Sequence, residues 1–174
     1  MLIRGIASLS RWDGTTIVNR PDATTAGDVI SDLRTQSNTL SVWRADSEED
    51  INDALVALSL NRTDVSKVIA LLLDEKELEA MQITFSDKLP GKAPGAIDAI
   101  KVKHRDLLEI DYKRLGVLSD YMMSIVHDKK KRVEISKPNL KKLLEQYKDT
   151  KRIKVEEMNE ELRSKLNWKE DGNT

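Results

Sequence analysis

The sequence predicts an α+β protein, with a mixed α/β N-terminal half that contains a β-α-β unit and a helical C-terminal half. Two observations carry this prediction. The run from Leu40 to Asp74 combines a short strand pattern, an amphipathic helix pattern and a second apolar run. From Ala96 onward, apolar residues recur at helical spacing. We therefore expect a core built around residues 40–74, followed by a helical layer.

The N-terminal segment predicts a strand, a hairpin and a short helix. Residues 2–9 alternate imperfectly between apolar and polar, and residues 15–18 are expected to pair with them across a turn that ends in glycine. Thr25 and Asp28 have the spacing of a capping box, in which two side chains satisfy the free N–H groups of a helix start. This spacing predicts a helix over residues 26–36.

The central run predicts strand, helix and strand in that order. Leu40 to Trp43 suits a half-buried strand, and Ser47 with Asp50 forms a second capping box. The apolar stripe of the helix consists of Ile51, Ala54, Leu55 and Leu58, whereas Asp50, Asp53 and Ser59 fall outside it. We expect a sheet to cover this stripe. Residues 65–73 contain the run VIALLL, which predicts a strand buried on both faces, with a buried helix as the alternative because of its alanine and leucines.

Residues after Asp74 predict a helix of one or two turns, followed by an edge strand that contains Ile83 and Phe85. Prolines and glycines then mark a connection. The expected organisation is a mixed α/β domain over residues 1–86, a Pro/Gly loop over residues 87–95, and a helical region over residues 96–174 that packs on the first domain or on a partner.

The second half predicts three helical stretches. Residues 96–125 follow a helical seam, which Gly116 divides if a helix ends there. In this pattern His104 and Asp111 share one face. Ser136 and Pro138 predict a helix start, with Leu140, Leu143, Leu144 and Tyr147 on the apolar side. A last helix is expected over residues 155–166.

The composition excludes several chemistries. The chain has no cysteine, which excludes disulfides, thiolate zinc sites and cysteine nucleophiles. With two histidines a histidine metal site is not expected, and the aromatic content of 4% disfavours stacked bases. We expect no cofactor and no metal. A leader sequence and a membrane-length apolar run are absent from the pattern, which predicts a cytoplasmic protein without a membrane partner.

Basic residues gather in the second half of the chain. Residues 1–100 contain 10 Lys/Arg and 16 Asp/Glu, whereas residues 101–174 contain 19 and 14. The basic half is therefore suited to an acidic partner, or to docking on its own acidic half. The predicted partner- or nucleic-acid-binding residues are Lys129, Lys130, Lys131, Arg132, Lys151, Arg152 and Lys154, and Lys137, Lys141 and Lys142 lie between these two groups.

A second set of polar candidates is acidic or mixed. Carboxylates cluster at the start of the predicted helix after Trp43. They either bind a metal ion there or are simply stabilised by the helix dipole. We expect Arg44 to form a salt bridge with this cluster. The polar candidates are Arg44, Asp46, Asp50, His104 and Asp111.

The sequence favours a binding or regulatory module over an enzyme. In this hypothesis the helical C-terminal half engages a protein partner or a second copy of the chain. The alternative is a nucleic-acid-associated protein that contacts the phosphate backbone through its basic turns. A second alternative is a carboxylate-dependent, metal-assisted hydrolase centred on Asp46 and Asp50.

Overall fold

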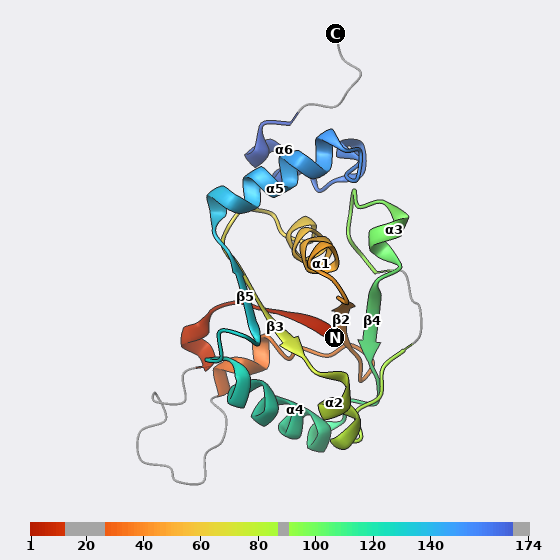
Figure 1. Cartoon of the computed structure of the whole chain (residues 1–174), viewed down its shortest axis with the longest axis vertical. Helices are drawn as coiled ribbons and strands as arrows, with labels where there is room; N and C mark the ends of the chain where they lie inside the picture. The colour runs from red at the N-terminus through yellow and green to blue at the C-terminus, as the bar shows by residue number, and fades with distance from the viewer. Residues whose placement is uncertain (13–26, 87–90, 169–174) are drawn as a thin grey trace. The chain divides into compact units, whose positions relative to one another are not determined.

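The computed structural model describes residues 1–12, 27–86 and 91–168 (Figure 1). The fold is α+β, as the sequence predicts, and its antiparallel sheet has the strand order β4-β2-β1-β3-β5. The strands are β1 (Leu2–Ile6), β2 (Leu40–Arg44), β3 (Val68–Leu73), β4 (His104–Leu107) and β5 (Arg132–Ile135). The helices are α1 (Glu48–Leu60), α2 (Glu75–Ala80), α3 (Asp98–Lys101), α4 (Tyr112–Ile125), α5 (Lys137–Asp149) and α6 (Glu160–Leu166), with short 3-10 helices η1 (Leu9–Trp12), η3 (Gly27–Ser31) and η4 (Val155–Glu157).

The chain forms two compact units, each assembled from three segments. Unit 1 contains the described parts of Met1–Trp43, Ile69–Asp87 and Arg105–Val133. Unit 2 contains those of Arg44–Val68, Lys88–His104 and Glu134–Thr174. Each unit contains segments that precede the connection at residues 87–95 and segments that follow it. The sequence-based division at that connection stays a prediction.

The two strands and the helix of the central run form in the predicted order, with one strand added between them. The Ser47 hydroxyl accepts the N–H of Asp50 at 3.1 Å and caps α1. All six residues of β3 are buried, which confirms a strand covered on both faces. However, β1 lies between β2 and β3 and pairs antiparallel with β3, from Leu2 opposite Leu73 to Ile6 opposite Ile69. The β-α-β unit is therefore split by the N-terminal strand.

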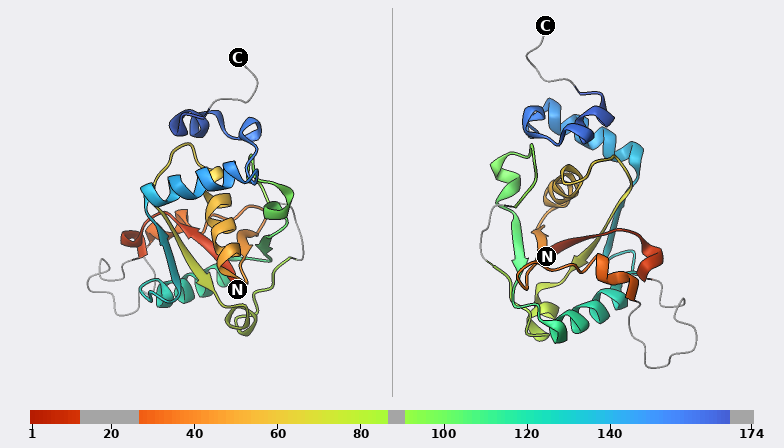
Figure 2. Two further views of the ribbon diagram at one scale, coloured as in Figure 1. Left: turned by 45° about the horizontal axis from the view of Figure 1, so that its top comes forward. Right: turned by 180° about the vertical axis from the view of Figure 1, so that it is seen from behind.

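Unit 1 has an apolar core between the sheet, α2, α4 and the first 3-10 helices. Both views of Figure 2 show α2 and α4 side by side next to the sheet. Asp74 and Asp111 accept backbone N–H groups at the starts of α2 and α4, which explains where these helices begin. The core residues include Leu2, Trp12, Leu33, Leu40, Leu71, Leu73, Leu78, Ile83, Leu107, Leu118 and Met122.

Unit 2 is helical, and α1 packs there against α3 and α5. The helix predicted after Ser136 is α5, with Leu140, Leu144 and Tyr147 buried as expected. Gly95 has a φ of +82°, and a Cβ atom at this position would lie 2.5 Å from Met158 Cγ. Only glycine suits this close approach.

The continuous helical seam predicted over residues 96–125 is wrong. The structure divides this stretch into α3, β4 and α4, and Gly116 lies inside α4 rather than at a helix end. His104–Leu107 becomes a strand because it pairs with β2 on one side and with the chain near Phe85 on the other. The Phe85 bridge is what remains of the predicted edge strand.

Three smaller predictions also need correction. The helix expected over residues 26–36 is limited to the 3-10 helix η3, since Asp32 turns inward to accept hydrogen bonds. The last helix is interrupted before Asn159, whose side chain caps α6. Asp53 and Ser59 are buried rather than solvent-facing. The predicted hairpin strand at residues 15–18 lies outside the described residues.

Candidate functional site

The acidic start of α1 is engaged by basic residues of the same chain. Arg44 donates to Asp46 at 2.7 Å, which confirms the expected salt bridge. Asp50 accepts the N–H of Asp46 at 2.9 Å and also binds the Lys103 ammonium group. The hydrogen bond from Lys103 lowers the pKa of Asp50 to about 2, although partial burial opposes this shift. Two of the predicted acidic candidates are therefore ion-paired at neutral pH.

Asp53 is the centre of a buried ionic network in unit 2. This residue is fully buried, and its carboxylate accepts from the Tyr147 hydroxyl at 2.7 Å and from the Lys103 ammonium at 2.6 Å. One guanidinium nitrogen of Arg152 donates to both carboxylate oxygens, at 2.7 and 2.8 Å. Arg152 also pairs with Glu49. The network joins α1 to the segment before β4 and to the turn after α5.

The pKa shifts in this network favour the protonated form of every donor. Burial alone would lower the pKa of Lys103, but its hydrogen bonds to Asp50 and Asp53 raise it above the ordinary value. The same holds for Arg152, where burial is outweighed by the bond to Glu49 and the charge of Asp53. Burial raises the pKa of Tyr147, and its bond to Asp53 adds to the shift. The network therefore holds α1, the segment before β4 and the end of α5 together through paired charges.

Two basic residues from the second half of the sequence, Lys103 and Arg152, thus pair with carboxylates of α1. Sequence patterns do not point to Lys103 or Tyr147 as participants, and they place Asp53 outside the apolar stripe of the helix. A signal was available, since Asp53 precedes Ala54–Ala57, four consecutive apolar residues that are all buried. A helix that is apolar on most sides has little solvent face.

The predicted basic residues fall in both units. Lys129 and Lys130 are exposed in the turn before β5, in unit 1, where Asp128 accepts the N–H of Lys130 at 2.8 Å. The carbonyl of Lys131 accepts from β3, and Arg132 donates to the carbonyl of Val126 at 2.7 Å. These contacts shape a short turn with two lysine side chains in solvent.

In unit 2, the second basic group consists of Lys151, Arg152 and Lys154, and its members differ in what they contact. Arg152 belongs to the buried network, and Lys154 pairs with Glu157 at 2.8 Å. Lys151 is exposed at the end of α5. With the exposed Lys137, Lys141 and Lys142 of α5 it makes up a set of exposed lysines, here called the lysine face, which the exposed Glu145 and Asp149 of the same helix interrupt. Within residues 1–12, 27–86 and 91–168, none of these four ammonium groups has an ion-pair partner.

His104 and Asp111 do not form the pair that the helical pattern predicted. His104 is buried as the first residue of β4, in unit 2. Asp111 is the N-cap of α4 in unit 1 and accepts the N–H of Arg114 at 2.8 Å. The prediction that the two residues share a helix face is wrong, because His104 belongs to strand β4 and Asp111 precedes helix α4.

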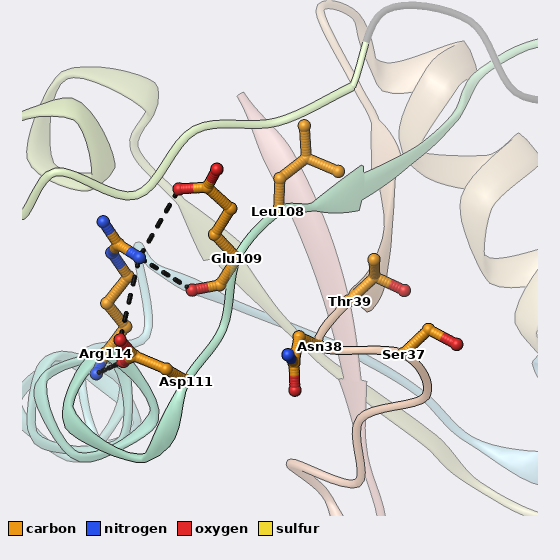
Figure 3. Close-up of a pocket in the computed structure, with 7 residues that line it drawn as sticks. All are labelled: Ser37, Asn38, Thr39, Leu108, Glu109, Asp111 and Arg114. Carbon is orange, nitrogen blue, oxygen red and sulfur yellow. Dashed lines mark hydrogen bonds and ion pairs between the residues drawn. The ribbon is translucent and has the colours of Figure 1, made fainter.

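A pocket of about 440 Å³ lies in unit 1 beside the start of α4 (Figure 3). Ser37 and Asn38 form one wall, with φ angles of 53° and 57°. Gln36 and Thr39 exchange backbone hydrogen bonds around them at 3.1 and 3.0 Å, the arrangement of a type I′ turn. The lining residues are Ser37, Asn38, Thr39, Leu108, Glu109, Asp111 and Arg114.

The charges inside this pocket compensate one another in part. Arg114 donates to the Glu109 carbonyl at 3.0 Å and lies 3.5 and 3.8 Å from the carboxylates of Glu109 and Asp111 (Figure 3). Arg114 is thus already neutralised, and Leu108 is the apolar lining residue. Six of the seven lining residues are polar or charged, whereas small-molecule sites are lined mostly by hydrophobic and aromatic side chains. Arg44, Asp46 and Asp50 are not among its lining residues.

Three further findings concern ligands and relatives. Among the described residues, no three His, Asp or Glu side chains are placed to hold a metal ion. No helix in the described ranges has the length and apolar character needed to cross a bilayer. No protein-family model matches the chain, and searches of curated proteins and of solved structures return no match. No relative therefore supplies an activity or a ligand.

Proposed function

We propose that this chain is a binding module that engages a protein partner through the lysine face of α5. The observation that supports the proposal is the contrast between two sets of basic residues in unit 2. Lys103 and Arg152 are ion-paired within the fold, whereas the four lysines of the lysine face are exposed and lack ion pairs among the described residues. Exposed lysines that are not ion-paired within the fold attract a complementary acidic surface and speed encounter.

A protein partner fits this unit better than a nucleic acid does. Exposed carboxylates of η4 and α6 lie in the same unit, and they belong to Glu156, Glu160 and Glu161. A phosphate backbone is uniformly negative and is repelled by them. A folded protein carries both signs of charge and is able to complement lysines and glutamates together. The buried side of α5 is occupied within the unit by Leu140, Leu144 and Tyr147, so the outer side is the surface offered to a partner.

The test compares the full chain with the double variant Lys141→Glu/Lys142→Glu in quantitative cross-linking and co-purification. The matched control is Lys76→Glu, which reverses an exposed lysine of α2 in unit 1. We expect a stoichiometric protein partner that is retained by wild type and by the control and is lost by the double variant. The absence of such a partner, or its retention by the double variant, contradicts the proposal.

The turn of Lys129, Lys130 and Lys131 in unit 1 favours a second candidate function, which is contact with a nucleic-acid phosphate backbone. Consecutive lysines held in a tight turn resemble a phosphate-contacting loop, because each contact releases a bound counterion. Fluorescence anisotropy with labelled duplex and single strands tests this candidate across salt concentrations. Binding should weaken steeply with salt, and Lys129→Glu/Lys130→Glu should lower the slope by about 1 per lost contact. Binding that does not depend on salt, or the absence of binding, would contradict this candidate function.

A further inference from the structure

The pocket in unit 1 is lined by hydrogen-bonding groups that the fold leaves unused. Within residues 1–12, 27–86 and 91–168, the Ser37 hydroxyl and the Asn38 side-chain amide have no hydrogen-bond partner. The Glu109 carboxylate has one charged neighbour, Arg114, at 3.5 Å, and a carboxylate has room for about four hydrogen bonds. The pocket therefore has both donors and acceptors to offer to a ligand.

The backbone of both pocket walls is held in place. Among the described residues, six non-glycine residues have a positive φ, and Ser37, Asn38 and Glu109 are three of them. The first two belong to the type I′ turn, whereas Glu109 lies in the connection between β4 and α4, where its carbonyl accepts the N–H of Asp111 at 2.8 Å. The N–H of Ile110 donates to the Asn38 carbonyl at 2.7 Å and joins the two walls. Backbones of this kind persist where the surrounding structure holds them, and they cluster at ligand sites.

Hydrogen-bonding side chains lie on both sides of the pocket. Figure 3 shows two groups on opposite sides with an apolar side chain between them: Ser37, Asn38 and Thr39 on one side, Glu109, Asp111 and Arg114 on the other, and Leu108 between the groups. Hydroxyl and amide groups donate and accept, a guanidinium only donates, and a carboxylate only accepts. A ligand that fits the pocket must do both.

This mixture of groups selects the chemistry of the ligand. An anion such as phosphate only accepts hydrogen bonds, and the carboxylates of Glu109 and Asp111 would repel it. An ammonium group only donates, so it would leave the donors of Asn38 and Arg114 without an acceptor. An apolar molecule would contact Leu108 alone. A hydroxyl group donates and accepts at once, which suits both sides of the pocket.

We propose that this pocket binds a neutral polyhydroxylated molecule of the size of a monosaccharide. Neighbouring hydroxyls of the ligand bind the Glu109 carboxylate on one side and the Asn38 amide on the other, and its C–H groups lie against Leu108. The volume of about 440 Å³ lies within the usual range of ligand sites. Because Ser37, Asn38 and Glu109 are exposed, binding displaces much water, and we expect a Kd of about 1 to 10 mM. The lysine face of α5 takes no part in this site.

An NMR titration of the nitrogen-15-labelled full chain tests the proposal. The neutral probes are glucose, galactose, mannose, ribose and inositol, each added to about 100 mM, well above the expected Kd. The charged probes are inorganic phosphate and methylammonium. We expect at least one neutral probe to shift the amide signals of residues 36–39 and 108–114 in a saturable way, with little change elsewhere. Neither charged probe should do so.

Two isosteric variants and a matched control test which side chains make the contacts. Asn38→Asp removes the amide donor, and aspartate adopts the same left-handed backbone, whereas Glu109→Gln removes the charged acceptor. Both side chains are exposed, so the fold, checked by circular dichroism, should be kept, and each change should weaken binding by about threefold to tenfold. The control Asn139→Asp makes the same change at an exposed residue of α5 in unit 2 and should leave binding unchanged.

Three results would overturn the proposal. The first is the absence of a saturable shift with every neutral probe. The second is binding of phosphate or methylammonium in the pocket that is as tight as that of the neutral probes. The third is binding of a neutral probe that neither Asn38→Asp nor Glu109→Gln weakens.

Discussion

Each unit contains a buried carboxylate that joins segments far apart in the chain. In unit 1, Asp32 accepts from the Trp12 indole nitrogen at 2.8 Å and from the Ala7 N–H at 3.0 Å. In unit 2, Asp53 binds donors from two other segments. Among the described residues, no buried side-chain nitrogen or oxygen lacks a hydrogen-bond partner. A buried charge is stable only when it is paired in this way.

The substitution Asp53→Asn should lower the free energy of unfolding by about 3 kcal/mol. The amide keeps the shape of the side chain but removes the charge that faces Lys103 and Arg152. Urea unfolding followed by circular dichroism measures the change. The control is Asp46→Asn, in the exposed pair with Arg44, which should cost less than about 1 kcal/mol. Equal effects of the two substitutions would show that burial of Asp53 contributes nothing to stability.

At the scale of elements, helix boundaries follow local caps. Ser47, Asp74, Asp111 and Asn159 each accept backbone N–H groups at a helix start, and such caps contribute about 1 kcal/mol each. The glycines behave differently from one another. Gly95 is required by its positive φ and close contacts, whereas Gly116 has open space around it.

Gly116→Ala should raise the free energy of unfolding by about 0.5 to 1 kcal/mol. Alanine loses less backbone entropy than glycine when α4 forms. The same change at Gly95 is the matched control. It should destabilise the fold by about 1 to 3 kcal/mol, because φ is +82° and Lys154 O lies 2.8 Å from the added Cβ. Thermal unfolding of both variants checks the opposite signs; equal signs would contradict this account.

At the scale of the whole molecule, opposite charges in the two halves of the sequence are used within unit 2. Lys103 and Arg152 come from the basic half, and both bind carboxylates of α1. Stability should therefore depend on pH in the acid range, where carboxylates take up protons.

The folded pKa of Asp50 is about 2, below the value of about 3.9 in an unfolded chain. A lowered pKa contributes stability above pH ~4 that is lost as pH falls towards ~2. With allowance for partial exposure, this contribution is about 1 to 2 kcal/mol. Asp50→Asn should be less stable than wild type by this amount at neutral pH, and the difference should close between pH ~4 and ~2. A constant difference in urea unfolding across that range would contradict the assignment.

The sequence by itself determined the α+β class, the strands and helices of residues 40–74, and the start of α5. These features depend on signals within a few residues of one another, such as the Ser47–Asp50 cap and the apolar run of β3. The Arg44–Asp46 salt bridge could be predicted for the same reason, because the two residues are neighbours in sequence. Local patterns are readable without knowledge of the tertiary structure.

Only the tertiary structure decided that His104–Leu107 is a strand, that β1 divides the β-α-β unit, and that Asp53 is buried. The donors to Asp53 lie 50, 94 and 99 residues away in sequence, and β4 acquires its state by pairing with β2. Helical spacing in residues 96–125 was overridden by these long-range contacts. Strand pairing and burial of a charge depend on which distant segments meet, and that is settled by the packing of the whole fold rather than by local residue order.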